Sequence, residues 1–163
     1  MFRKRKLARG QAKYDEGHYA EAYAILLPLA KRGSSVAQGV VGSMLFSGMH
    51  REQKEQASDG MLEPDDATIR ADQELAAQML LAASNAGIGP ASFNLAQMYV
   101  MGFGGGDWRE RKLRAAALFR LAKDQGFTAF AWLTLGEGEG EPYFGILEEH
   151  AKEVGCKPPG EQE

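Results

Sequence analysis

Side chains able to do metal or nucleophilic chemistry are few in this sequence and stand far apart. The three histidines are His18, His50 and His150, with no pair at i, i+4 and no cysteine cluster nearby. A metal site needs several convergent ligands at suitable spacing, so we expect surface histidines and no bound metal. The one cysteine, Cys156, has no assignable partner base, which predicts an inert thiol rather than a nucleophile.

Two glycine-rich segments have the composition of ligand-binding loops without the spacing. The run from Gly102 to Gly106 matches neither G-x-G-x-x-G nor the P-loop lysine pattern, so a junction between repeated units explains it better. Glu137, Glu139 and Glu141 alternate with glycine, which leaves their carboxylates unfixed and favours a solvated linker over a cation site. The sequence also lacks a catalytic triad, an acid pair and a cofactor fingerprint. We therefore expect no cofactor and no catalytic residue, and we do not expect an enzyme.

The composition favours a helical domain. The chain has 163 residues, of which 44% are hydrophobic and 25% charged, with 40 Ala and Leu against 12 Val, Ile and Thr. This bias favours helices and leaves strands without their preferred residues. The net charge of −3 argues against a dedicated nucleic-acid binder.

The sequence shows neither a membrane span nor an export signal. No run approaches the roughly 18 apolar residues that a transmembrane helix requires. The basic residues Arg3 to Lys6 are followed by Leu7 to Gly10 rather than by an apolar signal core. We expect a cytoplasmic protein; the alternative is the mature part of an exported one.

Two segments share a series of small residues at identical spacing. The first series is Ala22, Gly33, Ala37, Gly42 and Gly48, and the second is Ala76, Gly87, Ala91, Ala96 and Gly102. A third copy begins in the same way, with Ala115 placed 11 residues before Gly126. Apolar residues precede each turn glycine in an i, i+1, i+4 stripe: Ile25, Leu26 and Leu29; Met79, Leu80 and Ala83; Leu118, Phe119 and Ala122. Each copy therefore begins with an amphipathic helix that stops at a glycine in the left-handed conformation.

A second helix follows each glycine, roughly over residues 35–47, 89–101 and 128–135, so the repeated unit is a helix hairpin. Small residues at matched places in the second helices, Gly42, Ala96 and Gly136, allow close helix approach. A single hairpin cannot bury its apolar stripe. The copies are therefore predicted to stack into an all-α, α/α solenoid.

These residues resemble the Sel-one-like repeat family, whose α/α solenoids are related to tetratricopeptide repeats. Residues 91–102 hold an Ala, a Leu followed by a small residue, a Met-Tyr pair and a closing Gly as the family places them. Residues 36–48 are similar, with Leu45 in place of the Tyr, and residues 10–22 resemble a tetratricopeptide helix turn. The resemblance covers about residues 7–136. It implies a right-handed superhelix of about three to four hairpins with a C-terminal capping helix.

The chain departs from regular repeats between Met49 and Ala71. The first two turn glycines are 54 residues apart and the next two 39, so about 15 residues are inserted there. The insert 49–71 should form a loop at one edge, and Pro64 to Asp66 could begin an extra helical turn before Asp72.

The last repeat is predicted to end early, in the glycine-rich residues 136–142. Residues 143–154 have helical spacing and are interpreted as the capping helix, and residues 156–163 as a flexible tail. We therefore predict one domain over residues 1–155.

The resemblance also implies which residues line a concave groove, because the second helix of each pair faces it in such solenoids. The matched positions are Leu7, Gln11, Ser43, Phe46, Phe93, Gln97, Met101, Phe130 and Leu133. Such a groove suits an extended or helical peptide, with aromatic pockets as anchors and Gln11 and Gln97 hydrogen-bonding its backbone. For Phe93, Phe130 and Leu133, packing between repeats is an equal alternative.

The leading functional hypothesis is a non-catalytic adaptor or scaffold that binds another protein or peptide in this groove. The alternative is an accessory subunit of a larger assembly, including a membrane-associated one, that uses the convex face or the insert 49–71. A hydrolase, an activity sometimes suggested for such repeats, would need a titratable candidate residue, and the sequence offers none. We expect neither a small-molecule substrate nor a nucleic-acid partner.

Charge is distributed unevenly between the two ends of the chain. The first ten residues carry five basic side chains and no acid, whereas the segment from Glu137 onward carries eight acids and two lysines. Solubility of the first helix and a flexible acidic tail would explain this. The alternative is that the basic helix contacts an acidic partner, an anionic lipid surface or RNA.

Overall fold

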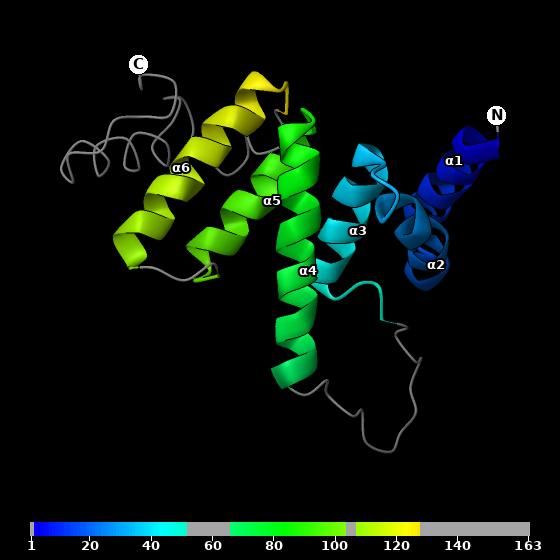
Figure 1. Ribbon diagram of the computed structural model, residues 1–163, viewed down its shortest axis with the longest axis horizontal. Coiled ribbons are helices and arrows are strands. Elements are labelled where there is room, and N and C mark those ends of the chain that lie inside the picture. Colours follow the sequence, from blue (N-terminus) through cyan, green and yellow to red (C-terminus); the bar gives the residue numbers. More distant parts are fainter. Residues whose placement is uncertain (1, 52–65, 104–106, 128–163) are drawn as a thin grey trace. The chain divides into compact units, whose positions relative to one another are not determined.

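The computed structural model describes residues 2–51, 66–103 and 107–127, where all regular structure is α-helical (Figure 1). The helices are α1 (Phe2–Asp15), α2 (Tyr19–Ala30), α3 (Ser35–Ser47), α4 (Asp66–Asn85), α5 (Gly89–Val100) and α6 (Trp108–Asp124). No strand occurs in these segments, so the predicted all-α class is confirmed for them. The excess of Ala and Leu over β-branched residues is the physical reason.

The chain divides into two compact units, Met1–Ala86 and Gly87–Glu163. In the first unit α1 packs on α2, α2 on α3 and α3 on α4, so each helix contacts the next one along the chain (Figure 1). In the second unit α5 packs on α6. The single domain over residues 1–155 stays a prediction. None of the described helices is long and apolar enough to cross a membrane.

The repeat pattern predicts that helices end at certain glycines. At these positions the glycines have the left-handed conformation. The three turn glycines Gly33, Gly87 and Gly126 have φ angles of +83°, +86° and +80°. After α2 the N–H of Gly33 donates to Ala30 O at 3.0 Å, and the N–H of Ser34 donates to Leu29 O at 3.1 Å. This pair of bonds is a Schellman motif, which satisfies carbonyl groups that the helix itself leaves unpaired. The predicted helix stops are confirmed.

The predicted second helices agree with the observed ones where the structure describes them. Helix α3 spans the predicted residues 35–47, and α5 ends one residue short of the predicted 89–101. Helix α4 begins at Asp66, which confirms the helical turn expected ahead of Asp72. Several predictions lie outside the described residues: most of the insert 49–71, the helix at 128–135, Gly136, the capping helix at 143–154 and the tail 156–163.

The apolar stripes predicted for the first helices face the interior. The buried members are Leu26, Leu29, Met79, Leu80, Ala83, Phe119 and Ala122. Ile25 and Leu118 are half-buried. Burial of one stripe per helix is what an amphipathic helix needs for stability in water, so the helical periodicity identified the core correctly.

The small residues at matched positions are buried between helices. Completely buried alanines at these positions include Ala22, Ala37, Ala76, Ala96 and Ala115. Gly42 in α3 is also buried, and a Cβ added there would lie 2.7 Å from Leu80 Cγ in α4. A side chain at position 42 would therefore push α3 and α4 apart, which confirms the steric role predicted for this glycine.

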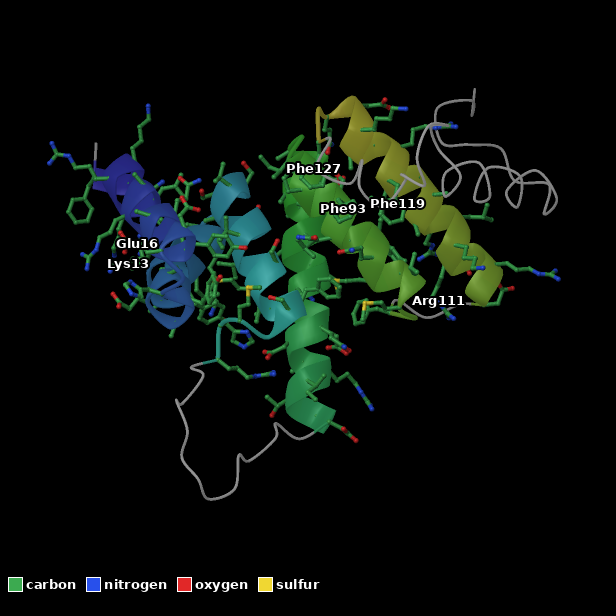
Figure 2. All side chains as sticks on the ribbon, turned by 180° about the vertical axis from the view of Figure 1, so that it is seen from behind. Lys13, Glu16, Phe93, Arg111, Phe119 and Phe127 are labelled. Carbon is green, nitrogen blue, oxygen red and sulfur yellow. The ribbon has the colours of Figure 1, made fainter. Side chains whose placement is uncertain are left out.

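Three phenylalanine rings form much of the core of the second unit (Figure 2). The centroid of the Phe93 ring lies 5.4 Å from that of Phe119 and 5.2 Å from that of Phe127. Beside them, the completely buried Ser92 donates its hydroxyl proton to Gln125 Oε1 at 2.7 Å. Aromatic packing and one satisfied polar pair thus join α5 to the end of α6.

Candidate functional site

The predicted groove residues of the second unit form one row along α5. Phe93 and Gln97 are four residues apart on one side of α5, and Met101, the residue directly after the helix, continues the same spacing. Their exposure rises along the row: Phe93 is 8% exposed, Gln97 is half-buried and Met101 is 75% exposed. The row therefore begins in the core and ends at the surface.

Two roles were predicted for Phe93, lining a groove or packing between helices, and the structure shows the packing role. Its ring contacts Phe119 of α6 and Phe127, which follows α6. A ring enclosed in this way fixes α5 on α6 rather than presenting an aromatic pocket. Gln97 and Met101 are the members of the row that a partner can reach.

The C-terminal end of α5 has exposed apolar side chains next to an arginine that is fixed by its contacts. Met101 and Val100 are 75% and 42% exposed. The guanidinium of Arg114 lies 5.8 Å from the centroid of the Tyr99 ring, and it pairs with Glu110 one turn earlier in α6. The interaction with Tyr99, followed by that with Glu110, raises the pKa of Arg114. A permanently charged group thus lies over the ring next to the exposed apolar residues.

In the first unit the predicted residues form two short rows. Leu7 and Gln11 are one turn apart on α1, and Ser43 and Phe46 are three residues apart on α3. All four are half-buried. The Ser43 hydroxyl donates to Gly39 O at 2.8 Å, so its proton is used within α3. Phe46 is the aromatic member of these rows and remains partly open to solvent.

Part of the predicted site lies outside the residues that the structure describes. These positions are Phe130 and Leu133 of the groove, His150, Cys156, and the acidic residues Glu137, Glu139 and Glu141. The groove role of Phe130 and Leu133 stays a prediction. Within each unit, the structure brings together Gln97 with Met101, Leu7 with Gln11, and Ser43 with Phe46.

A polar cluster that was not predicted from the sequence lies where the insert meets the helices. His50 Nε2 lies 3.0 Å from Asp72 Oδ2, and Arg51 binds the same carboxylate. The Tyr23 ring centroid is 5.0 Å from that of His50. The His50 side chain is only 11% exposed, so the expectation of a surface histidine is wrong for this residue. The reason is tertiary, because α2 and α4 supply the Tyr23 and Asp72 side chains that cover it.

Both ring nitrogens of His50 face oxygen atoms of other residues. Its Nδ1 lies 3.2 Å from the carbonyl oxygen of Met44, while Nε2 faces Asp72. Burial, followed by the charge of Asp72, raises the pKa of the nearby Tyr23 hydroxyl.

The cluster joins the residues on either side of the segment 52–65. His50 and Arg51 stand just before that segment and Asp72 follows it in the first half of α4. Two basic residues at the start of the insert and an acid directly after it were the available sequence signal. The contacts suit a structural clasp. Among the described residues, no group of three His, Cys, Asp or Glu side chains is placed to hold a metal ion.

His18 is the surface histidine that the sequence predicted. Its side chain is 53% exposed, and its Nδ1 lies 3.3 Å from Glu16 and 3.1 Å from Lys13 Nζ. These solvated contacts at the turn between α1 and α2 leave no enclosed position for a ligand.

A scan against protein-family models found no match, and searches of curated proteins and of solved structures found no similar protein.

Proposed function

We propose that the chain is a non-catalytic adaptor or scaffold that binds a partner polypeptide along the second helix of its hairpins. The observation that carries this proposal is the row of Phe93, Gln97 and Met101. Phe93 is buried and anchors α5, whereas Gln97 is half-buried and Met101 is exposed to solvent. An apolar side chain that is 75% exposed on an anchored helix gains from being covered. Methionine is well suited to this role because its flexible thioether adapts to different apolar surfaces.

The bound segment is extended or helical and lies along the second helices. Met101 and Phe46 supply its apolar contacts, and the amides of Gln97 and Gln11 donate to and accept from its backbone. Amide side chains suit this role because each can pair with both an N–H and a C=O group.

The finer architecture belongs to the same proposal. The hairpins stack as a right-handed α/α solenoid of about three to four repeats, of the Sel-one-like type. The matched small residues, the left-handed turn glycines and the close approach at Gly42 support it, because repeated hairpins need the same spacing at every contact. Small-angle scattering tests the shape: a compact globule of this length has a radius of gyration near about 15 Å, and a superhelix exceeds it.

Affinity capture from the native cell, followed by mapping of the captured segment and titration of that peptide, tests the function. Met101→Ala, Gln97→Ala and Phe46→Ala should each weaken peptide binding with little change in melting temperature. A loss of melting temperature with unchanged affinity would assign the residue to the core instead.

Leu121→Ala is the matched control for Met101→Ala. Leu121 is an apolar residue of the same unit and is 38% exposed, but it lies on α6, the first helix of a predicted pair. Its truncation should leave peptide affinity unchanged. Equal losses of affinity in the two variants would contradict a binding row on α5.

The clasp of His50, Arg51 and Asp72 favours one second candidate, an accessory subunit that uses the insert 49–71. The contacts on Asp72 fix both ends of that insert on the first unit. Deleting residues 52–65 while keeping the clasp separates the two functions. Lost assembly with intact peptide binding supports the subunit, and unchanged assembly supports the adaptor.

A further inference from the structure

The first half of α1 presents a basic face that carries an aromatic ring. Phe2, Arg5, Lys6 and Arg9 stand at i, i+3, i+4 and i+7, so they share one side of the helix. All four are exposed, and Phe2 is 79% exposed. The exposed aromatic ring beside three cations gives this side of α1 both an apolar and a cationic character.

The second half of α1 is held on the first unit. Gly10 is the buried residue of the helix, and an added Cβ there would clash with the Leu26 side chain of α2. Nearer the end of α1, Lys13 Nζ lies 3.2 Å from Glu16 and 3.6 Å from Glu21 (Figure 2). The helix is therefore fixed on α2 through its second half, while Phe2, Arg5, Lys6 and Arg9 stay exposed.

The placement of these cations opposes the helix dipole. The N-terminal end of a helix carries partial positive charge and favours acidic side chains, but the first turn of α1 has none. Arg3, Lys4 and Arg5 stand there instead. If helix stability alone decided the sequence, acidic side chains would be expected in this first turn. The arrangement becomes favourable when an external anionic surface faces it.

We infer that this face docks on an anionic lipid bilayer, with Phe2 in the interfacial region and Arg5, Lys6 and Arg9 at the headgroups. Lys and Arg next to an apolar ring are the features that place a helix on a charged membrane surface. The exposed aromatic suits the interfacial region of a bilayer, where an aromatic side chain at the helix end can enter the headgroup layer. RNA is disfavoured because Tyr14, the other aromatic of α1, packs edge-on against Tyr19 at 5.4 Å instead of offering a second stacking platform.

Sedimentation of the full chain with phosphatidylcholine vesicles, with and without phosphatidylserine, tests the inference. The chain should bind only the vesicles that contain phosphatidylserine, and added salt should release it because the attraction is screened. The triple variant Arg5→Gln, Lys6→Gln, Arg9→Gln should lose on the order of 100-fold in binding, since each cation contributes about fivefold. Phe2→Ala should weaken binding without changing its salt dependence.

Arg70→Gln is the control. Arg70 is an exposed cation of the first unit and lies on α4, which packs on α3. This variant should bind vesicles within about twofold of the unchanged chain, because its cation is on another helix than the basic face. The helix content of the triple variant should be unchanged or higher, since cations have been removed near the positive end of a helix.

Three results would overturn the inference. One is equal binding to vesicles with and without phosphatidylserine, and another is equal loss of binding in the triple variant and the control. The third is binding to single-stranded RNA that the triple variant abolishes, in the absence of vesicle binding. A failure of any of these kinds leaves the adaptor function untouched, because peptide affinity is measured separately.

Discussion

Leu80 of α4 packs directly against the backbone of Gly42 in α3. A Cβ built on Gly42 would lie 2.7 Å from Leu80 Cγ and 3.2 Å from the Leu80 backbone nitrogen. Gly33 differs, because no atom lies within 4 Å of its added Cβ while its φ is +83°. The repeat therefore uses glycine in two ways, to bring helices together and to end them.

Gly42→Ala should lower the free energy of unfolding by about 1–3 kcal/mol, because the new methyl group overpacks against Leu80. The intrinsic helix preference of alanine acts in the opposite direction by roughly 0.5–1 kcal/mol, so the sign of the result decides between the two effects. Urea unfolding measures it. In a Leu80→Ala background the same change should cost less, and an equal cost there would show that the two positions do not interact.

Gly33→Ala should destabilise the first unit by about 1–2 kcal/mol through backbone strain alone, since there is room for a side chain. Asparagine tolerates the left-handed conformation better, so Gly33→Asn should cost less than Gly33→Ala. Thermal unfolding of both variants checks the order. Equal melting temperatures for all three proteins would show that the helix stop does not depend on the left-handed residue.

Phe93→Ala should cost about 3–5 kcal/mol of stability, because the ring fills the space between Phe119 and Phe127. Met101→Ala, at the other end of the same row, should change stability by about 0.5 kcal/mol or less. Denaturant titration of the two variants measures this contrast. Similar losses in both would mean that Met101 is covered in solution.

Asp72→Asn should lower the pKa of Tyr23 without returning it to the ordinary tyrosine value. Burial is the larger cause of the raised pKa and remains, whereas the charge of Asp72 is removed. Because the folded-state pKa is raised, the stability that Tyr23 contributes is fully present below the ordinary tyrosine pKa and is lost as the pH rises through the raised value. Ultraviolet titration against Tyr23→Phe isolates this group. An unchanged pKa would show that the charge of Asp72 does not act on Tyr23.

The positions of the helix ends followed from the sequence because they depend on local chemistry. The left-handed Gly33 and two hydrogen bonds within residues 29–34 end α2, and both act within a few residues of the chain. The buried stripes of Leu26, Leu80 and Phe119 followed from helical period in the same way.

Tertiary structure decided what each side chain meets. Phe93 and Met101 belong to one predicted row, yet one is enclosed and the other open, because Phe119 and Phe127 cover only the first. His50 and Asp72 are 22 residues apart, and no local rule brings them together. Periodicity tells which side of a helix is apolar. Whether a given position is covered, and by which partner, depends on packing between segments distant in the chain.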